Sequence, residues 1–164
     1  MAYHPIGGIV PVKKFEEIYN IIKDIEDAEV RIAPDETLYI INLNASQAKE
    51  IAAITEDGAK NLFETSVSCI GSTVCQIGLR DSQGLLASIV ATVEPYHFAD
   101  GVLPRIHISG CTSSCGTHQI GKLGFHGASK RVDGKMQPAF AFHVNGTDAQ
   151  GAEHFGEEWG VMAG

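Results

Sequence analysis

Apolar residues recur every three or four positions near the start of the chain, with lysine and glutamate residues between them. This spacing places one apolar stripe along a helix and predicts an amphipathic helix over Pro11–Ile25. Two short runs rich in branched side chains follow, Glu29–Ala33 and Leu38–Leu43, separated by Pro34-Asp35-Glu36. Short runs of this kind around a turn sequence predict a β-hairpin.

A second helix is predicted after the hairpin. Ser46 is a suitable N-cap for a helix over Gln47–Ile54, which would end near Gly58. If Gly8–Val12 forms a leading strand, the order of elements is βαββα. That order is typical of a ferredoxin-like half domain, in which two helices cover one face of an antiparallel sheet, and it predicts an α+β fold.

The second part of the chain alternates between helical and strand patterns. Apolar residues from Ile77 to Val93 predict a helix that ends before Pro95. Three strands are then expected: Arg105–Ser109, Leu123–Arg131 and Ala139–Val144, the last two joined by a turn at Asp133-Gly134. The glycine-rich and acidic segment from residue 145 to residue 164 predicts no element.

The composition, with 44% apolar and 20% charged residues and a mean hydropathy of +0.01, indicates a soluble globular protein. No apolar run reaches the roughly 18 residues of a membrane span, and no secretory signal is visible, so we expect a cytoplasmic protein. The net charge of −8 argues against nucleic acid as a partner. The acidity is uneven, because six basic and twelve acidic residues precede Cys69, whereas six basic and eight acidic residues follow it.

All four cysteines lie in the second, nearly neutral part, as Cys69-x5-Cys75 and Cys111-x3-Cys115, and a glycine lies close to each pair. In a reducing compartment such thiols are more often metal ligands or catalytic groups than disulfides. Four thiolates on two loops can enclose one 4Fe–4S cluster, since each iron needs one external sulfur. A structural zinc site is the alternative, although its pairs are usually spaced C-x2–4-C.

Both motifs carry a family resemblance. Cys69-Ile70-Gly71-Ser72-Thr73-Val74-Cys75, followed by Asp81, resembles the C-x-G-x3-C segment of the siroheme-dependent nitrite and sulfite reductases. Gly110-Cys111-Thr112-Ser113-Ser114-Cys115-Gly116 and the following Leu123-Gly124-Phe125 resemble the second cluster motif of that family. The family commonly has Pro-Asn where this chain has Thr112 and Ser113.

The resemblance implies a 4Fe–4S cluster held by Cys69, Cys75, Cys111 and Cys115. Cys115, matching the last cysteine of the family motif, would also bridge to the iron of siroheme as its axial ligand. A small anion, nitrite or sulfite, would bind the opposite face of that iron and be reduced by six electrons. The protein would supply ligands, orientation and positive charge.

Siroheme carries many carboxylates, so basic residues near the cysteines are candidates for binding it. We expect Arg80, Arg105 and Lys122 in this role, with Lys130 and Arg131 as further candidates. His107 and His118 flank the second motif, but a lone histidine is more often structural than catalytic. We therefore assign no catalytic residue from the sequence.

The resemblance divides the chain into a ferredoxin-like half domain, residues 1–62, and a cluster- and siroheme-binding region, residues 63–164, which we expect to be truncated at its C-terminal end. Full-size members of the family have two such units, whereas this chain has one. The missing half would come from the rest of a longer reductase or from a homodimer mate, and an electron donor is also implied. The alternative functions are a non-catalytic iron–sulfur electron-transfer module and a structural zinc-binding module.

Overall fold

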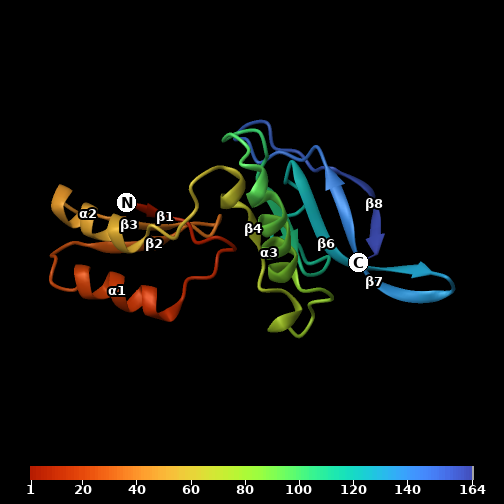
Figure 1. Ribbon diagram of the computed structural model, residues 1–164, viewed down its shortest axis with the longest axis horizontal. Helices are drawn as coiled ribbons and strands as arrows, with labels where there is room; N and C mark the ends of the chain where they lie inside the picture. The colour runs from red at the N-terminus through yellow and green to blue at the C-terminus, as the bar shows by residue number, and fades with distance from the viewer. Residues whose placement is uncertain (164) are drawn as a thin grey trace. The chain divides into compact units, whose positions relative to one another are not determined.

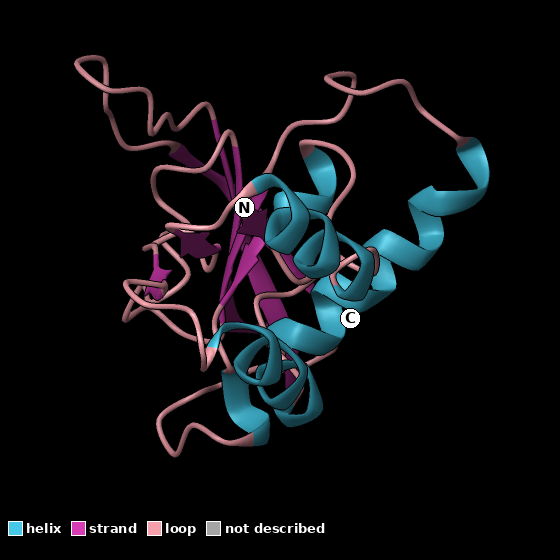
Figure 2. Cartoon of the chain, turned by 90° about the vertical axis from the view of Figure 1, so that its left-hand side faces the viewer, coloured by secondary structure: helices cyan, strands magenta, loops and turns pink. Residues whose placement is uncertain are grey.

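The computed structural model describes residues 1–163 and divides the chain into two compact units, Met1–Lys60 and Asn61–Gly164. Each unit combines helical segments with a β-sheet of its own (Figure 2), so the predicted α+β class is confirmed. Among the residues that the structure describes, no helix is both long enough and apolar enough to cross a membrane.

The first unit has the predicted βαββα order, and its three strands form an antiparallel sheet in the order β1-β3-β2 (Figure 1). The leading strand is not Gly8–Val12, as the sequence pattern suggested, because Gly7 and Gly8 both have positive φ angles and form a turn. Residues 2 and 3 pair with β3 instead. The elements are β1 (Ala2–Tyr3), α1 (Val12–Ile22), β2 (Glu29–Ile32), β3 (Leu38–Ile41) and α2 (Ala45–Ile54).

The core of this unit lies between the sheet and the two helices. Its fully buried apolar side chains are Tyr3, Ile18, Leu38, Ile40 and Ile51. Leu38 and Ile40 occupy alternate positions of β3, because successive side chains of a strand point to opposite faces of the sheet. Of the apolar stripe predicted for α1, Ile18 is buried and Ile22 packs against this core, whereas Val12, Phe15 and Tyr19 are exposed.

The cap of α2 differs from the prediction. Asn44, not Ser46, is the N-cap: its side chain accepts hydrogen bonds from the backbone N–H groups of Ser46 at 2.9 Å and Gln47 at 3.0 Å. The Gln47 side chain accepts from the Asn44 N–H at 2.8 Å, which completes a capping box. Ser46 lies inside the first turn, because the extended backbone that a cap requires is found at Asn44.

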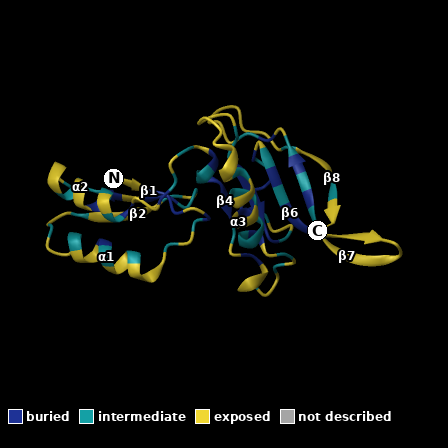
Figure 3. Cartoon of the chain, viewed as in Figure 1, coloured by how far each residue is buried: buried dark blue, intermediate teal, exposed yellow. Residues whose placement is uncertain are grey.

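The second unit is built on a mixed five-stranded sheet with the order β4-β5-β6-β7-β8. The first three strands run parallel, and the last two pairings are antiparallel (Figure 1). The three strands predicted here are confirmed, but the final strand was missed because glycine and acidic residues obscure its pattern. The strands are β4 (Val67–Ser68), β5 (Ile106–Ser109), β6 (Leu123–Val132), β7 (Lys135–Val144) and β8 (Glu157–Ala163), and the tip of the β6–β7 hairpin is exposed (Figure 3).

The helix of this unit, α3 (Ser82–Val93), begins later than the apolar pattern predicted. Asp81 caps it by accepting a hydrogen bond from the Gly84 N–H at 2.8 Å. Residues 77–80 are not helical, since the N–H groups of Leu79 and Arg80 both donate to the Gly110 carbonyl at 2.9 Å. Short 3-10 turns occupy Phe63–Thr65, Gly71–Thr73 and Glu94–Tyr96, and α3 packs its Leu86 into the core with Phe63, Ile106 and Ile108.

Candidate functional site

The two cysteine loops meet because β4 and β5 are parallel neighbours. Ser68 pairs with Ile108, so both strands end at the same end of the sheet; Cys69 follows β4 directly, and Cys111 follows β5 after Gly110. The Cys69 N–H donates to the Ile108 carbonyl at 3.1 Å. The Gly110 N–H donates to Sγ of Cys69, also at 3.1 Å. The first cysteine of each motif is thereby held at one end of the sheet.

The loop from Cys69 to Cys75 is folded tightly by a 3-10 turn. The Cys75 N–H donates to the Gly71 carbonyl at 2.9 Å. Gly71 has a φ of +66°, and a Cβ there would lie 2.5 Å from Oγ of Ser82. Only glycine fits this position, both for its backbone conformation and for its close approach to the start of α3.

The second loop is packed against the end of β5. The Gly116 N–H donates to Oγ of Ser109 at 3.0 Å, and a Cβ on Gly116 would lie 1.9 Å from the Ile108 carbonyl oxygen. Cys115, immediately before this glycine, is exposed. The exposed thiol is therefore held on a tightly packed backbone and is open to a group that approaches from outside.

All four thiols are free, and three of them are partly buried. Oγ of Ser82 lies 3.3 Å from Sγ of Cys69 and donates to the Cys69 carbonyl at 2.7 Å. Hydrogen bonds from the side chain and the backbone of Ser113 lower the pKa of the Cys111 thiol. A thiolate is the form that ligates a metal, so this environment favours metal binding at Cys111.

Arg80 is the basic residue that the structure places beside the cysteine loops. Its N–H and that of Leu79 both donate to the Gly110 carbonyl, and its guanidinium lies 5.9 Å from the centre of the Phe140 ring. Its Nε atom is buried without a hydrogen-bond partner. A buried donor of this kind costs free energy unless another group accepts from it, so the position suits an anionic ligand.

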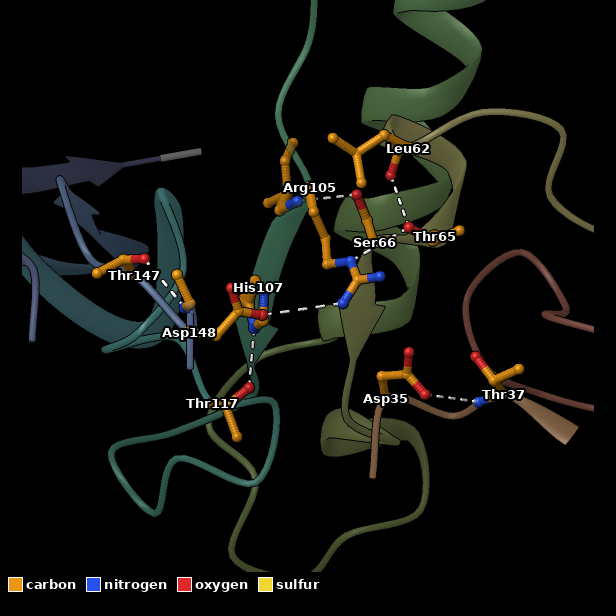
Figure 4. A network of polar contacts seen from close by, with 12 residues as sticks. Asp35, Thr37, Leu62, Thr65, Ser66, Arg105, His107, Thr117, Thr147 and Asp148 are labelled. Atoms are coloured by element: carbon orange, nitrogen blue, oxygen red, sulfur yellow. Dashed lines mark hydrogen bonds and ion pairs between the residues drawn. The ribbon is translucent and has the colours of Figure 1, made fainter. Parts of the chain in front are cut away.

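Arg105 and Lys122 lie at the other end of the sheet, because Arg105 precedes β5 and Lys122 precedes β6. The four residues of β5 span about 13 Å and separate this end from the cysteines. Both side chains line a pocket of about 710 Å³. Nε of Arg105 donates to Oγ1 of Thr65 at 3.1 Å, and its Nη1 lies 3.9 Å from Asp148 (Figure 4).

The remaining candidates also lie apart from the cysteines. His107 lines the same pocket, its Nδ1 lies 2.8 Å from Oγ1 of Thr117, and burial lowers its pKa (Figure 4). Lys130 and Arg131 lie on the β6–β7 hairpin, where they donate to the carbonyls of Val161 at 2.8 Å and Gly134 at 3.1 Å. The Lys130 contact joins the hairpin to β8, and the Arg131 contact lies within the hairpin turn.

Sequence reasoning missed three serines beside the site: Ser82, Ser109 and Ser113. Ser82 is 13 residues from Cys69 along the chain, and nothing in the sequence pattern links the two. Ser113 carried a signal, since it stands where the resemblance led us to expect an asparagine. Its hydroxyl forms a hydrogen bond with the Cys111 thiol.

Comparison with curated proteins finds relatives in two groups of reductases. The chain is 28% identical over 166 residues to the ferredoxin–nitrite reductase of Synechococcus elongatus, an alignment that covers 93% of this chain and 31% of that protein. It is 24% identical over 149 residues to the sulfite reductase [NADPH] hemoprotein beta-component of Bacillus velezensis, covering 84% of this chain and 26% of the relative. The chain thus spans about a third or less of the length of these relatives.

Among solved structures, the NirA protein of Mycobacterium tuberculosis has the same fold. The superposition has a TM-score of 0.81 at 18% sequence identity and covers 99% of this chain and 32% of that one. No family model matches the sequence. Both units of the chain therefore have counterparts within a single larger protein of known structure.

Proposed function

We propose that this chain, which resembles the nitrite/sulfite reductase family in sequence and in fold, is the part of such a reductase that binds a 4Fe–4S cluster and siroheme. The resemblance predicted from the two cysteine motifs is confirmed by these relatives. The observation that carries the proposal is that the two cysteine loops meet at one end of the sheet, where β4 and β5 end. There the Gly110 N–H donates to Sγ of Cys69 at 3.1 Å.

The donor set fits a cluster. Cys69, Cys75, Cys111 and Cys115 supply four thiolates from two loops, the number that one cubane cluster requires. Backbone N–H groups directed at the sulfurs are a common feature of cluster sites, because they compensate the negative charge and raise the reduction potential. The Gly110 N–H already has this position toward Cys69.

Cys115 is the proposed bridge to the siroheme iron. It is the exposed cysteine of the four, so one face of its sulfur is accessible while Gly116 anchors its backbone. Arg80, with its buried Nε, is suited to a carboxylate of the cofactor or to the anionic substrate. When bound, siroheme and cluster would supply the redox chemistry that takes nitrite to ammonia or sulfite to sulfide.

Arg105 and Lys122 remain proposed binding residues for an anion, but their pocket lies at the opposite end of β5. We therefore assign the primary role to Arg80. The substrate, an electron donor, a cytoplasmic location, and a second half of the reductase or a homodimer mate are parts of the same proposal. In full-size reductases of this family the siroheme pocket is formed by two units, each a half domain followed by a cluster region. A complete pocket would therefore need roughly one more unit of this kind.

Anaerobic reconstitution tests the proposal. The purified chain is incubated with iron, sulfide and siroheme, followed by absorption and electron paramagnetic resonance spectra and by analysis of iron, sulfide and zinc. We expect about four iron and four sulfide ions per chain, because a cubane cluster contains four of each. The Soret and red bands of siroheme should also appear. Cys69→Ser should lose the cluster signal, and Val74→Ala, an exposed change in the same loop, should keep it.

Three outcomes would contradict parts of the proposal. Cluster bands without siroheme bands, in the chain alone and in the full-length reductase, indicate an electron-transfer module. A colourless protein with one zinc ion per chain indicates a structural zinc site. A Cys115→Ser variant that keeps siroheme ligation and reductase activity in the full-length enzyme would show that Cys115 is not the bridge.

A further inference from the structure

Three histidines meet in the second unit at a place that the proposed cluster and siroheme site does not use. His118 follows the second cysteine loop, His126 lies on β6 and His143 lies on β7. Their ring centroids are 4.7 to 5.0 Å apart, and the side chains are only 2%, 9% and 8% exposed. Each ring offers one nitrogen, and these three nitrogens all lie within 4.8 Å of one another. The three histidines are the group with this metal-site spacing in the part of the chain that the structure describes.

The strand register explains why they meet. His143 pairs with Gly124 on β6, and residues 124 and 126 lie on the same face of that strand because side chains alternate. His126 and His143 therefore share a face as diagonal neighbours. A Cβ on Gly124 would lie 1.9 Å from the His118 carbonyl oxygen, so the glycine allows the His118 backbone to lie directly over this face.

The hydrogen bonds of the cluster bring ring nitrogens of the three histidines close together, and a metal would take the place of the proton shared by His126 and His143. Nδ1 of His126 and Nε2 of His143 are 2.9 Å apart, a distance at which one nitrogen donates and the other accepts. Nδ1 of His118 lies 3.0 Å from Oγ of Ser109, which also accepts from the Gly116 N–H. Ser109 has room to accept from Nδ1–H of His118 as well, and that tautomer leaves Nε2 of His118 as a bare acceptor.

Burial favours the neutral form of His118 and His126, and neutral imidazole is the form that ligates a metal. Burial, together with His126 and His143, lowers the pKa of His118 to about 4. Burial and His143 lower the pKa of His126, while the nearby carboxylate of Glu158 acts in the opposite direction. Glu158 pairs with His143 across β7 and β8. A cation at this point would have imidazole nitrogens around it and the Glu158 carboxylate near His126.

We propose that His118, His126 and His143 form a binding site for a divalent cation of the Zn²⁺ class. Imidazole nitrogens prefer Zn²⁺ and its transition-metal neighbours, and bind zinc at about 2.0–2.1 Å. Tetrahedral ligands at that distance are about 3.3 Å apart. The nitrogens already lie within 4.8 Å, so small side-chain rotations bring them to the metal. Three protein ligands leave the fourth position for water.

Ser109 links this site to the cysteine loop. Its hydroxyl contacts both His118 and the N–H of Gly116, the residue after Cys115. A ligating histidine commonly has its other ring nitrogen held by such a partner, which fixes the orientation of the ring. Ser109 is thus a positioning residue. We expect Ser109→Ala to weaken zinc binding about 10–100-fold without removing a ligand.

Zinc titration of the full chain tests the site. Because cysteine thiolates are also zinc ligands, the first measurement uses a variant in which all four cysteines are serine, and calorimetry with zinc alone should give one ion per chain. Single changes His118→Ala, His126→Ala and His143→Ala should each weaken binding at least about tenfold, since each removes one of three ligands. His97→Ala, a change at an exposed histidine elsewhere in the same unit, should leave the affinity unchanged.

A second measurement keeps the test independent of how the serine variant folds. The wild-type chain without iron should take up two zinc ions, and His126→Ala should take up one while its circular dichroism stays that of the wild type. The proposal is overturned if the serine variant is folded and binds no zinc. It is equally overturned if the affinity and stoichiometry are the same in the three histidine variants and in His97→Ala. The cluster and siroheme assignments are tested separately by the anaerobic reconstitution, and the result of the zinc titration does not affect them.

Discussion

The backbone N–H of Gly110 donates a 3.1 Å hydrogen bond to Sγ of Cys69, although 41 residues separate the two along the chain. This bond joins the two cysteine loops at the ends of β4 and β5. It depends on close packing, because the backbone of Gly110 itself lies against Arg80 and Gly71. The predictions for this site follow from that contact.

Replacement of Gly110 by alanine should disturb both loops at once. A Cβ there would lie 2.9 Å from the Arg80 carbonyl oxygen and 3.0 Å from Cα of Gly71, so the backbone must shift. We expect a loss of about 1–3 kcal/mol in the free energy of unfolding, measured by urea denaturation, and weaker retention of a reconstituted cluster. Gly160→Ala is the matched control, since a Cβ at Gly160 meets nothing within 4 Å. Equal stability of the two variants would contradict the prediction.

Ser82→Ala should lower the reduction potential of the reconstituted cluster. Oγ of Ser82 lies 3.3 Å from Sγ of Cys69 and donates to the Cys69 carbonyl at 2.7 Å. When the cluster is reduced, its more negative sulfur should draw this proton from the carbonyl, because hydrogen bonds to cluster sulfurs stabilise the reduced form. A redox titration followed by electron paramagnetic resonance measures the change. Ser88→Ala, a change on the same helix away from the cysteines, should leave the potential where it is. An unchanged or higher potential in Ser82→Ala would show that the hydroxyl does not act on the sulfur.

Replacing Arg80 or Arg105 compares how much the two ends of the sheet contribute to siroheme binding. Arg80→Met keeps the length of the side chain but removes the charge beside the cysteine loops, so siroheme should bind at least about tenfold more weakly, the effect of losing one charge-assisted hydrogen bond. Arg105→Met removes a charge that already contacts Thr65 and Asp148, and should change siroheme binding less. Absorption titration of the chain with siroheme measures both affinities. The opposite ranking would move the anion site to the pocket at Arg105.

Asn44→Ala should destabilise the first unit by about 1 kcal/mol, because the N–H groups of Ser46 and Gln47 lose their acceptor. Ser46→Ala, at the residue that the sequence pattern had favoured as the cap, should change the stability by less than about 0.5 kcal/mol. Urea denaturation followed by circular dichroism compares the two variants. A larger loss in Ser46→Ala would mean that the helix begins later than Ala45.

The stability of the first unit should depend on Tyr3 at alkaline pH. Burial, together with a hydrogen bond to Asp57, raises the pKa of Tyr3 from 10.0 to about 12. The folded state therefore favours the protonated phenol. Its contribution, about 2 kcal/mol, is complete below pH 10 and is lost as the pH rises toward 12.

Urea denaturation of wild type and Tyr3→Phe at several pH values measures this contribution. The difference in the free energy of unfolding should be largest below pH 10 and should shrink between pH 10 and pH 12. Tyr19→Phe, at an exposed tyrosine, is the control for removal of a phenol hydroxyl from the same unit. A constant difference for Tyr3→Phe would exclude the raised pKa.

Local patterns in the sequence determined most of the elements. The helical stripe of α1, the hairpin of β2 and β3, and the strands β5 and β6 depend on side-chain periodicity and turn residues that act over short range. The two cysteine motifs were sufficient to predict the family resemblance, which the relatives confirm, and the cluster site that we propose. The errors occurred where local signals compete: two adjacent candidates for a helix cap, and apolar residues before Ser82 that suit a helix but instead bond to Gly110.

Only the tertiary structure decided which distant residues share a site. Strand register brings His143 beside His126, parallel pairing brings Cys69 to Gly110, and the direction of β5 separates Arg105 from the cysteines that it closely precedes in sequence. Such contacts join residues that are 17 to 41 positions apart, and no short-range pattern records them. These contacts are determined by strand pairing in the sheet and by glycines that allow two backbone segments to pack closely. Both depend on the fold of the whole chain.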